Sequence, residues 1–418
     1  MERPQLLDEK REYLWLFGVL LLLLGLHLAL RYQAYQQFTS TPFYFTHATV
    51  EQAYTKTKEG RTYRVLKLHS DEGWRFYTTT YNKRTLCGRR VRLQLFPSQN
   101  ISFWDFLGTF YVKSRIKRVE EPTPTIKQKL VEKVNAQHSE PLLQRFYNAI
   151  FFATPLQKRD REAISQLGIS HLVALSGFHL GILWGVVYGV LWLLYAPLQQ
   201  RYFPYRFALI DVGVVALGLL GAYVWFVDAP DSLVRAYGMV FAGWLALVSG
   251  VSLLSFGLLA VVMGLLVVLF PSLLVSVGFW FSVAGVFYIY LLLYYTQHLS
   301  KWWVVLVVIP FGIFVLMLPV VHTIFPLSAR CQLLSPLLSL LFTPFYPLVM
   351  VLHLVGEGGV LDGGLLKLFS LACETQERLL PWWGGVGYVL LSLGAVRQKR
   401  LFWLLLAVAL GVALWLYI

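Results

Sequence analysis

Charged side chains are scarce in this sequence. Asp, Glu, Lys and Arg make up 14% of its 418 residues, whereas soluble domains carry about 25%. Hydrophobic residues reach 57%, and several apolar runs approach the roughly 20 residues that a helix needs to cross a bilayer. This composition excludes a soluble globular protein and indicates a polytopic α-helical membrane protein.

Cysteine is scarce, and several catalytic motifs do not occur. Cys87, Cys331 and Cys373 are far apart and form no CxxC pair, so the sequence predicts neither a disulfide framework nor a cysteine-bound metal. We expect Cys331 and Cys373 to be small buried thiols. The sequence has no GxxxxGK[ST] phosphate loop and no nuclease constellation, so we expect no enzymatic activity and no cofactor.

Ten apolar runs are candidates for membrane-spanning helices. The first has a Lys10-Arg11 flank and no small-x-small cleavage site after it, so we interpret residues 1–40 as an uncleaved N-terminal anchor. Residues 170–418 form a multi-helix transmembrane domain in this interpretation. The ten runs are Tyr13–Leu30, Leu172–Tyr195, Phe207–Val227, Leu233–Ser249, Leu253–Phe270, Leu273–Tyr295, Trp302–Val320, Leu333–Val355, Trp382–Val396 and Leu401–Ile418.

Residues 41–118 have a different pattern. Short alternating stretches such as YRVLKLHS, WRFYTTTY and RRVRLQLF lie between turn residues, which predicts β-strands. Strands in a segment of this length are typical of a small barrel. The segment carries fifteen Lys and Arg against five acids, a net charge of +10. We therefore expect a small basic β domain between the anchor and the rest of the chain; the resemblance described below implies that it is an OB-like barrel.

Residues 119–169 connect this segment to the apolar domain. EEPTPT is a Pro-punctuated linker, and the residues after it alternate apolar and charged side chains near helical spacing. Such a pattern predicts amphipathic helices at the membrane surface.

Lys and Arg in short loops favour the cytoplasmic side of a membrane. A cytoplasmic N-terminus then places the β domain outside and Arg201, Arg206 and Lys301 inside. Counting every run as a span would leave the basic residues 397–400 outside. We therefore expect one segment within residues 333–380 to be re-entrant or interfacial, with the glycine-rich GEGGVLDGG as its break.

The stretch SHLVALSGFHLG, Ser170 to Gly181, places polar groups in an apolar run, where they are costly and usually serve a function. His171 and His179 are eight residues apart, about 12 Å along an unbroken helix, so a shared metal ion would require a break at Ser176-Gly177. Ser176 and His179 are compatible with a hydrolase dyad, although no acidic partner is near in sequence. Polar contacts between helices that pack closely at Gly177 and the lining of a pore stay open.

Three motifs resemble those of the ComEC competence family, inner-membrane channels that pass single-stranded DNA during natural transformation. SHLVALSGFHLGIL is similar to the family hallmark, and APDSLVRA (229–236) and GFWFSVAGV (278–286) resemble two further elements in order and spacing. Asp231 and Phe281 depart from the usual small residue and leucine. No HxHxDH motif occurs, so the resemblance is to a short form that lacks the C-terminal metallo-β-lactamase-like domain.

The resemblance implies a multi-pass protein of the bacterial inner membrane with an OB-like domain on the periplasmic or extracellular side. It implies single-stranded DNA as the passenger, a periplasmic DNA receptor and a cytoplasmic ATP-driven motor as partners, and it allows a homodimer. A small-solute transporter is the other class that fits the bundle, but it leaves the basic β domain unexplained.

Residues of the three motifs are the predicted pore or DNA path. Arg235 follows Asp228 and Asp231; it either snorkels and pairs with one of these acids or contacts phosphate bidentately. The predicted path residues are His171, Ser176, Gly177, His179, Arg235 and Ser282.

A second set, in the β domain, is predicted to bind DNA, because single strands are held by a basic groove with aromatic stacking platforms. Two other interpretations are that the aromatic residues form the core of the barrel and that the arginine cluster meets anionic lipid. The predicted DNA-binding residues are Trp74, Arg75, Tyr77, Lys83, Arg84, Arg89, Arg90 and Arg92.

Overall fold

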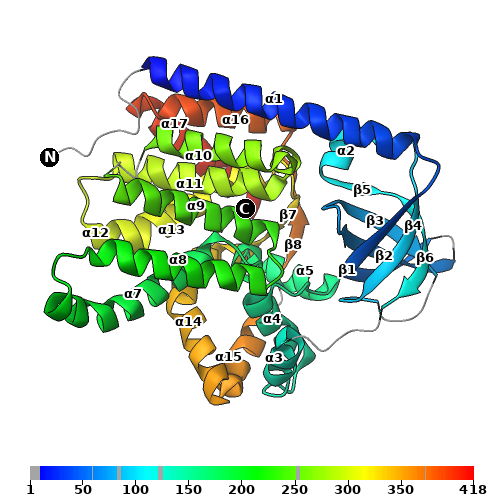
Figure 1. The fold of residues 1–418 in the computed structure, drawn as a ribbon. Helices are drawn as coiled ribbons and strands as arrows, with labels where there is room; N and C mark the ends of the chain where they lie inside the picture. The colour runs from blue at the N-terminus through cyan, green and yellow to red at the C-terminus, as the bar shows by residue number, and fades with distance from the viewer. Residues whose placement is uncertain (1–9, 59, 82–85, 121–125, 251–254, 372) are drawn as a thin grey trace. The chain divides into compact units, whose positions relative to one another are not determined.

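The computed structural model describes residues 10–58, 60–81, 86–120, 126–250, 255–371 and 373–418 (Figure 1). The chain divides into two compact units. The β unit comprises Glu9–Ile126 and Met263–Val277, and the helical unit comprises Met1–Asp8, Lys127–Val262 and Gly278–Ile418.

Helix α1 (Lys10–Ser40) opens the β unit. From Leu14 onward it is apolar enough to cross a membrane. Its 31 residues extend about 46 Å at 1.5 Å per residue, more than a bilayer core of roughly 30 Å. In its last turns Tyr35 and Phe38 pack against Phe106, so the end of α1 belongs to the core of the β unit.

The strands of the β unit form one six-stranded sheet in the order β5-β3-β2-β1-β4-β6. β3 and β5 pair in parallel, and all other neighbours pair antiparallel. The elements are β1 (Tyr44–Lys58), β2 (Arg61–Ser70), β3 (Arg75–Thr80), β4 (Arg90–Phe96), α2 (Phe103–Leu107), β5 (Thr109–Tyr111), β6 (Lys113–Val119) and the single turn η1 (Pro271–Val275).

The expectation of a closed barrel is wrong. Among the described strands, the edge strands β5 and β6 do not pair with each other. They are successive pieces of one chain segment with only Val112 between them, so they cannot form a ladder together. Thr78 Oγ1 of β3 and Ser114 Oγ of β6 nevertheless lie 2.8 Å apart, which shows that the sheet is strongly curved.

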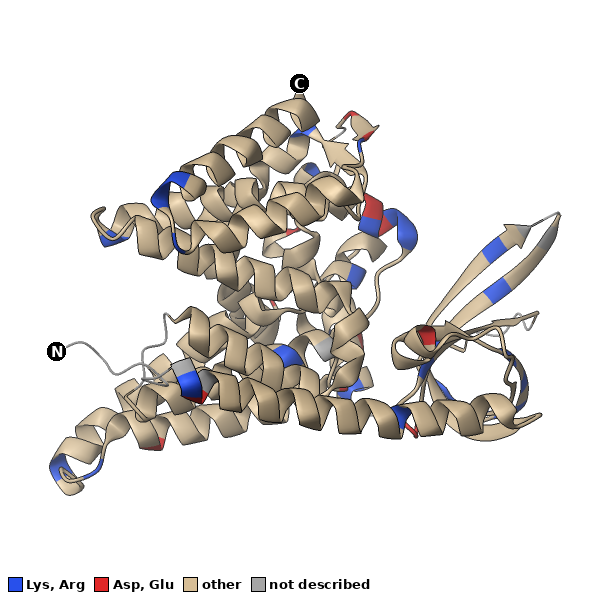
Figure 2. Ribbon diagram, turned by 90° about the horizontal axis from the view of Figure 1, so that it is seen from above, with Lys and Arg blue, Asp and Glu red and all other residues tan. Residues whose placement is uncertain are grey.

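The predicted alternation of the strands is confirmed. On β4, Val91, Leu93 and Leu95 are fully buried, whereas Arg90 and Arg92 between them are exposed. Burying every second side chain on one face stabilises a sheet through the hydrophobic effect. The polar residues remain on the outer face, and short stretches coloured for Lys and Arg occur on the strands of the β unit in Figure 2.

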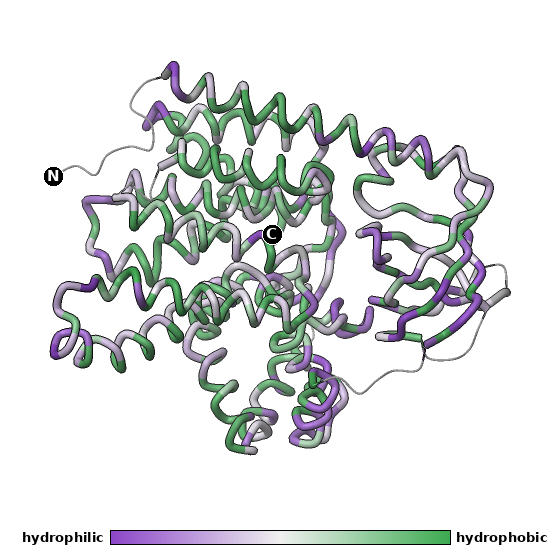
Figure 3. Tube along the Cα trace, viewed as in Figure 1, coloured by the Kyte–Doolittle hydropathy of each residue, from purple (hydrophilic) through white to green (hydrophobic). Residues whose placement is uncertain are grey.

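Apolar residues dominate the remaining helices (Figure 3). The remaining elements belong to the helical unit, except that residues 263–269 of α10 belong to the β unit. They are α3 (Ile126–Asn135), α4 (Pro141–Phe152), α5 (Lys158–Gln166), α6 (Ser170–Val173), α7 (Gly177–Tyr202), α8 (Ala208–Phe226), α9 (Asp231–Val248), α10 (Phe256–Leu269), α11 (Val277–Tyr295), α12 (Lys301–Trp303), η2 (Val304–Val308), α13 (Ile309–Val321), β7 (Leu327–Ala329), η3 (Arg330–Leu334), α14 (Ser335–Val355), η4 (Gly358–Leu361), α15 (Asp362–Phe369), β8 (Thr375–Glu377), α16 (Trp382–Ala395) and α17 (Lys399–Tyr417).

Seven helices of the described chain are long and apolar enough to cross a membrane. They lie within Leu14–Ser40, Gly177–Tyr202, Ala208–Phe226, Val277–Tyr295, Lys301–Val321, Arg330–Val355 and Lys399–Tyr417. The polytopic α-helical architecture is confirmed. Large apolar side chains such as Leu193 and Trp225 are exposed on these helices, as expected for surfaces that face lipid rather than water.

The chain between β7 and β8 leaves one surface of the helical unit and returns to it. These two strands pair antiparallel, Ala329 opposite Thr375, and α14 and α15 lie between them. The eight residues of α15 span only about 12 Å, too short to recross a bilayer as a helix. Gly356, in the left-handed conformation at the end of α14, starts the turn. The expected non-spanning segment with its glycine-rich break stays a prediction, because Arg330–Val355 is itself long and apolar enough to cross a membrane.

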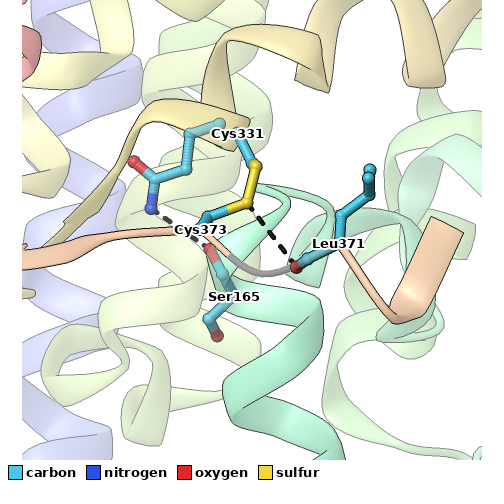
Figure 4. The surroundings of a disulfide bond; sticks show 5 residues. Ser165, Cys331, Leu371 and Cys373 are labelled. Atoms are coloured by element: carbon cyan, nitrogen blue, oxygen red, sulfur yellow. Dashed lines mark hydrogen bonds between the residues drawn. A yellow bond between two sulfur atoms is a disulfide. The ribbon is translucent and has the colours of Figure 1, made fainter.

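Cys331 and Cys373 form a disulfide (Figure 4), so the expectation of two buried thiols is wrong. Their separation of 42 positions carries no sequence signal for a bond. The pairing of β7 with β8 brings them together, and that pairing involves only three residues on each strand. Cys87 is a free, exposed thiol.

Candidate functional site

The signature stretch folds as a break between two helices. Helix α6 ends at Val173, and α7 begins at Gly177 with Ser176 as its N-cap. The Ser176 hydroxyl accepts from the backbone at the third helical position, and Nδ1 of His179 accepts from the Ser176 amide at 3.3 Å. This reciprocal capping box satisfies backbone donors that a helix start leaves free. The spacing of Ser176 and His179 therefore has a structural role.

The ring of His179 is fully buried. It lies edge-to-face with Phe342 at 5.0 Å and with Tyr346 at 4.9 Å between ring centroids. Ser176 Oγ is 3.4 Å from Nδ1, and Nε2 has no hydrogen-bond partner within the described chain. A hydrolase needs a base oriented by a third group, so this arrangement does not support the dyad interpretation.

The three motifs converge in the helical unit. A Cβ atom added at Gly177 would lie 3.4 Å from Cβ of Ala236, and one at Gly278 would lie 3.4 Å from Nη2 of Arg235. Ser232 Oγ also donates to the Leu175 carbonyl at 2.6 Å. Helices α7, α9 and α11 therefore meet at their motif residues, and small residues allow the close approach.

Arg235 lies at the centre of this convergence and is only 9% exposed. Asp228 does not pair with it as expected, because its carboxylate binds Nζ of Lys127 at 2.6 Å. The side chain of Asp231 lies outside the described residues. Ser282 is exposed on α11, four residues after Gly278 and so on the same side of that helix.

Helix α14 packs along the signature stretch, a role that the sequence analysis missed. Ser335 Oγ donates to the Gly168 carbonyl at 2.9 Å, and Ser339 Oγ lies 3.2 Å from Nε2 of His171. Phe342 and Tyr346 continue the same face with their rings against His179. These four residues of α14 follow one another at intervals of 4, 3 and 4, which places them on one face of the helix. The sequence contains this spacing, but it does not show that α14 packs against the signature stretch.

The same face of α14 ends at His353, in a cluster that was also missed. Nε2 of His353 lies 2.9 Å from Nε2 of His138, and Nδ1 of His138 lies 2.9 Å from Oδ2 of Asp362. Nδ1 of His353 must donate to the Val349 carbonyl at 2.6 Å, because a carbonyl only accepts. The Nε2 atoms of the two rings face each other, so one of them donates to the other, and Nδ1 of His138 faces the carboxyl group of Asp362.

The outer face of β1, β4 and β6 forms a basic surface, defined here by Phe45, Arg92, Arg115, Lys117 and Arg118. Arg92 lies opposite Arg118 in the ladder, and its guanidinium lies over the Phe45 ring at 5.7 Å from the centroid. All five side chains are exposed. Cations interleaved with an exposed aromatic ring are the elements of a single-strand binding surface.

An open groove adjoins this basic surface. It has a volume of about 490 Å³ and is lined by hydroxyl groups and cations. Tyr111 Oη lies 3.1 Å from Thr79 Oγ1 at its wall. The lining residues are Thr79, Thr80, Tyr81, Tyr111, Lys113, Ser114, Arg115 and Ile116. Of these, the sequence singles out only Tyr81, as one of the aromatic residues interleaved with cations, although the alternation in KSRIKRV indicates an exposed basic strand.

The residues predicted to bind DNA differ in their surroundings. Trp74 packs against Phe38 and Tyr44, with ring centroids 5.0 and 5.3 Å apart, and so contributes to the core. Arg75 lies 3.7 Å from Glu51. Tyr77 faces outward on β3.

The arginines on and before β4 are the more accessible members of the predicted set. Arg89 is half-buried, and Arg90 and Arg92 are exposed. Arg90 forms an ion pair with Asp71, whereas Arg92 belongs to the basic surface. Lys83 and Arg84 lie outside the described residues.

The electrostatics of the two sides of the sheet differ. On β2, Lys67 pairs with Glu51 at 3.0 Å. Burial, and next the positive charge of Arg75, lowers the pKa of His69, so this histidine adds no positive charge at neutral pH. Within the described residues, Arg92, Arg115, Lys117 and Arg118 form no ion pair with an acidic side chain, so the positive charge of the basic surface is not neutralised by direct contacts.

The apolar helices and the basic β unit define a polytopic membrane protein. Its helical unit has a polar site, where three motif-bearing helices pack around a buried arginine. Residues 154–417 match the family model described as "Competence protein", and the chain belongs to this family. The match includes all three motifs and α14. No curated protein and no solved structure matches the chain.

Proposed function

We propose that the protein is a channel that passes single-stranded DNA across the bacterial inner membrane during natural transformation. The observation that carries the proposal is the convergence of the three family motifs around Arg235, since Gly177 adjoins Ala236 and Gly278 adjoins the guanidinium. A guanidinium recognises phosphate bidentately, and every nucleotide of the passenger presents one phosphate.

We further propose that the basic surface of the β unit captures the strand before passage. The parallel pairing of β3 with β5 beside the antiparallel pairing of β1 with β4 supports an OB-like arrangement of the strands. The exposed Phe45 ring and the cations around it offer stacking and phosphate contacts at once. In this proposal the β unit lies on the extracytoplasmic side, where incoming DNA arrives.

Passage of a polyanion requires a driving force. The sequence has no GxxxxGK[ST] loop, so we propose that an ATP-driven motor in the cytoplasm acts on the strand as it emerges. A periplasmic DNA receptor would deliver the strand to the β unit. A homodimer is the assembly that we propose to test first.

Deletion of the gene tests the proposed function. We expect transformation to be lost while labelled DNA still accumulates in the outer compartment, because capture and entry precede this membrane. Restoring the gene at another locus should recover transformation and controls for effects on neighbouring genes. Normal transformation in the deletion strain would refute the proposal.

A further inference from the structure

The Cys331–Cys373 bond is held in a defined setting. The two Cα atoms are 6.0 Å apart, within the range of about 4.4 to 6.8 Å that disulfides need. Ala329 pairs with Thr375 in the β7–β8 ladder, so each cysteine lies two residues from a paired position. The register of the two strands therefore places the sulfur atoms opposite each other (Figure 4).

The residue after Cys331 anchors this setting to two helices. Nε2 of Gln332 donates to the carbonyls of Ser165 and Leu327 at 3.1 and 3.2 Å. Oε1 of Gln332 accepts from the Tyr417 hydroxyl at 3.0 Å. Cys331 in η3 is thus held against α5 and the end of α17. The segment that contains Cys373 must therefore approach Cys331 when the disulfide forms.

The segment with Cys373 is accessible to another protein. All three residues of β8 are exposed, and so is Glu374 before them. An exposed, extended and polar stretch beside a cysteine allows a thiol–disulfide oxidoreductase to approach the sulfur. Such a stretch also belongs at the water-facing surface of a membrane protein rather than among lipid tails.

The surrounding hydrogen bonds show which helix ends share this surface. The Leu380 amide donates to the His322 carbonyl, and the Arg378 amide donates to the Pro326 carbonyl, both at 2.8 Å. Helix α13 therefore ends where α16 begins. The opposite ends of these two helices lead to the loops before α12 and before α17, which must lie on the other surface of the helical unit.

These opposite loops are basic. Lys301 begins α12, and Arg397, Lys399 and Arg400 surround the turn from α16 to α17. Short loops rich in Lys and Arg are retained in the cytoplasm. Disulfides, in contrast, persist in oxidising compartments outside it. Two unrelated criteria, one from thiol chemistry and one from charge, thus give the same orientation of the helical unit.

We propose that Cys331 and Cys373 are the substrate of an extracytoplasmic thiol–disulfide oxidoreductase, and that β7 and β8 lie on the outer side of the membrane. One cysteine thiolate attacks the disulfide of the oxidase and forms a mixed disulfide. The other thiolate attacks that bond, which completes Cys331–Cys373 and releases the oxidase as a dithiol. The two cysteines lose two electrons and two protons, and the oxidase is reduced by the same amount.

Thiol counting on the unaltered full-length chain tests the oxidation. Cells are quenched in acid, denatured and treated with a maleimide that retards the chain on a gel. We expect one adduct, from Cys87, before reduction and three after it. In a strain without its extracytoplasmic thiol oxidase, we expect three adducts without reduction. Three adducts in the unaltered strain, or full oxidation without the oxidase, would overturn the proposal.

Single-cysteine labelling tests the orientation. All three native cysteines are changed to serine, and Gln376→Cys or Gln398→Cys is added, since both positions are exposed. A membrane-impermeable maleimide should label Gln376→Cys in intact cells and Gln398→Cys only after permeabilisation. The reverse pattern contradicts the proposal. If the serine variant fails to accumulate, the thiol count on the unaltered chain still tests whether the extracytoplasmic oxidase forms the Cys331–Cys373 bond. Neither the thiol count nor the labelling depends on DNA passage, so both are independent of the proposed channel function.

Discussion

Nδ1 of His138 lies 2.9 Å from Oδ2 of Asp362, although the two residues are 224 positions apart. The His138 side chain is fully buried and that of Asp362 is 18% exposed, so little water screens the pair. Through His353 the pair fixes the end of α14, whose other residues contact the signature stretch. This polar contact, which is far from the motifs, is therefore connected to them by one helix.

Removing one member of this pair should destabilise the helical unit. Asp362→Asn leaves His138 without its carboxylate, and loss of one partner of a buried pair costs about 3 kcal/mol. We expect a lower temperature of unfolding in detergent and faster proteolysis near η4. The double variant His138→Gln with Asp362→Asn should recover part of the loss, because no unpaired charge remains.

An exposed ion pair is the matched control. Lys158 and Glu162 lie 3.5 Å apart with side chains 89% and 57% exposed. Glu162→Gln should change stability by less than about 0.5 kcal/mol. Equal effects of Asp362→Asn and Glu162→Gln would show that the buried pair makes no special contribution.

Ser176 should behave as a helix cap and not as a nucleophile. Ser176→Ala removes the side chain that caps α7 and should cost about 1 kcal/mol, measured by thermal unfolding. Ser176→Asn keeps a capping oxygen and should retain both stability and transformation. Labelling of Ser176 by a serine-directed fluorophosphonate would contradict this assignment and revive the hydrolase interpretation.

The basic surface should control DNA affinity through charge. Arg92→Ala and Arg118→Ala each remove one cation, so the slope of log affinity against log salt should fall in magnitude by about 0.7 for each phosphate that the variant no longer neutralises. Fluorescence anisotropy of the full chain with a labelled oligonucleotide measures this slope. Arg75→Ala is the control, because Glu51 already neutralises Arg75 and the slope should change less.

Trp74 should behave differently from these arginines. Its ring packs in the core of the β unit, so Trp74→Ala should destabilise that unit by about 2 kcal/mol, less than for a fully buried aromatic residue. Affinity measured well below the unfolding temperature should keep its salt slope. A reduced slope with unchanged stability would instead show that Trp74 contacts DNA.

Local patterns predicted the membrane architecture and the strands well. Apolar runs such as Gly177–Tyr202 are long, and the alternation on β4 is regular, so each is determined by neighbouring residues alone. The barrel closure was wrong because it depends on which strands form the two edges of the sheet, here β5 and β6, and this is a property of the whole sheet. The disulfide was missed because a pairing of three residues, between β7 and β8, brings the cysteines together.

The candidate site was predicted in part. Gly177 was found in a stretch with polar groups in an apolar run, whereas Arg235 and the third motif were selected through the resemblance to the competence family. His138 and Asp362 were missed because they interact through a contact between distant segments. Neither residue belongs to a local motif in its own segment. His179 was found, but its capping role depends on the helix break at Ser176, which the apolar run conceals.

The most direct test of the proposed channel is the entry of labelled DNA into the cytoplasm of cells that carry Arg235→Ala. We expect entry to fall at least tenfold, with normal accumulation in the outer compartment and an unchanged amount of the chain on an immunoblot. Arg235→Lys should be intermediate because it keeps the charge without the bidentate geometry, and Arg397→Ala, in an exposed turn, should have no effect. Normal cytoplasmic entry in the Arg235→Ala strain would contradict the account.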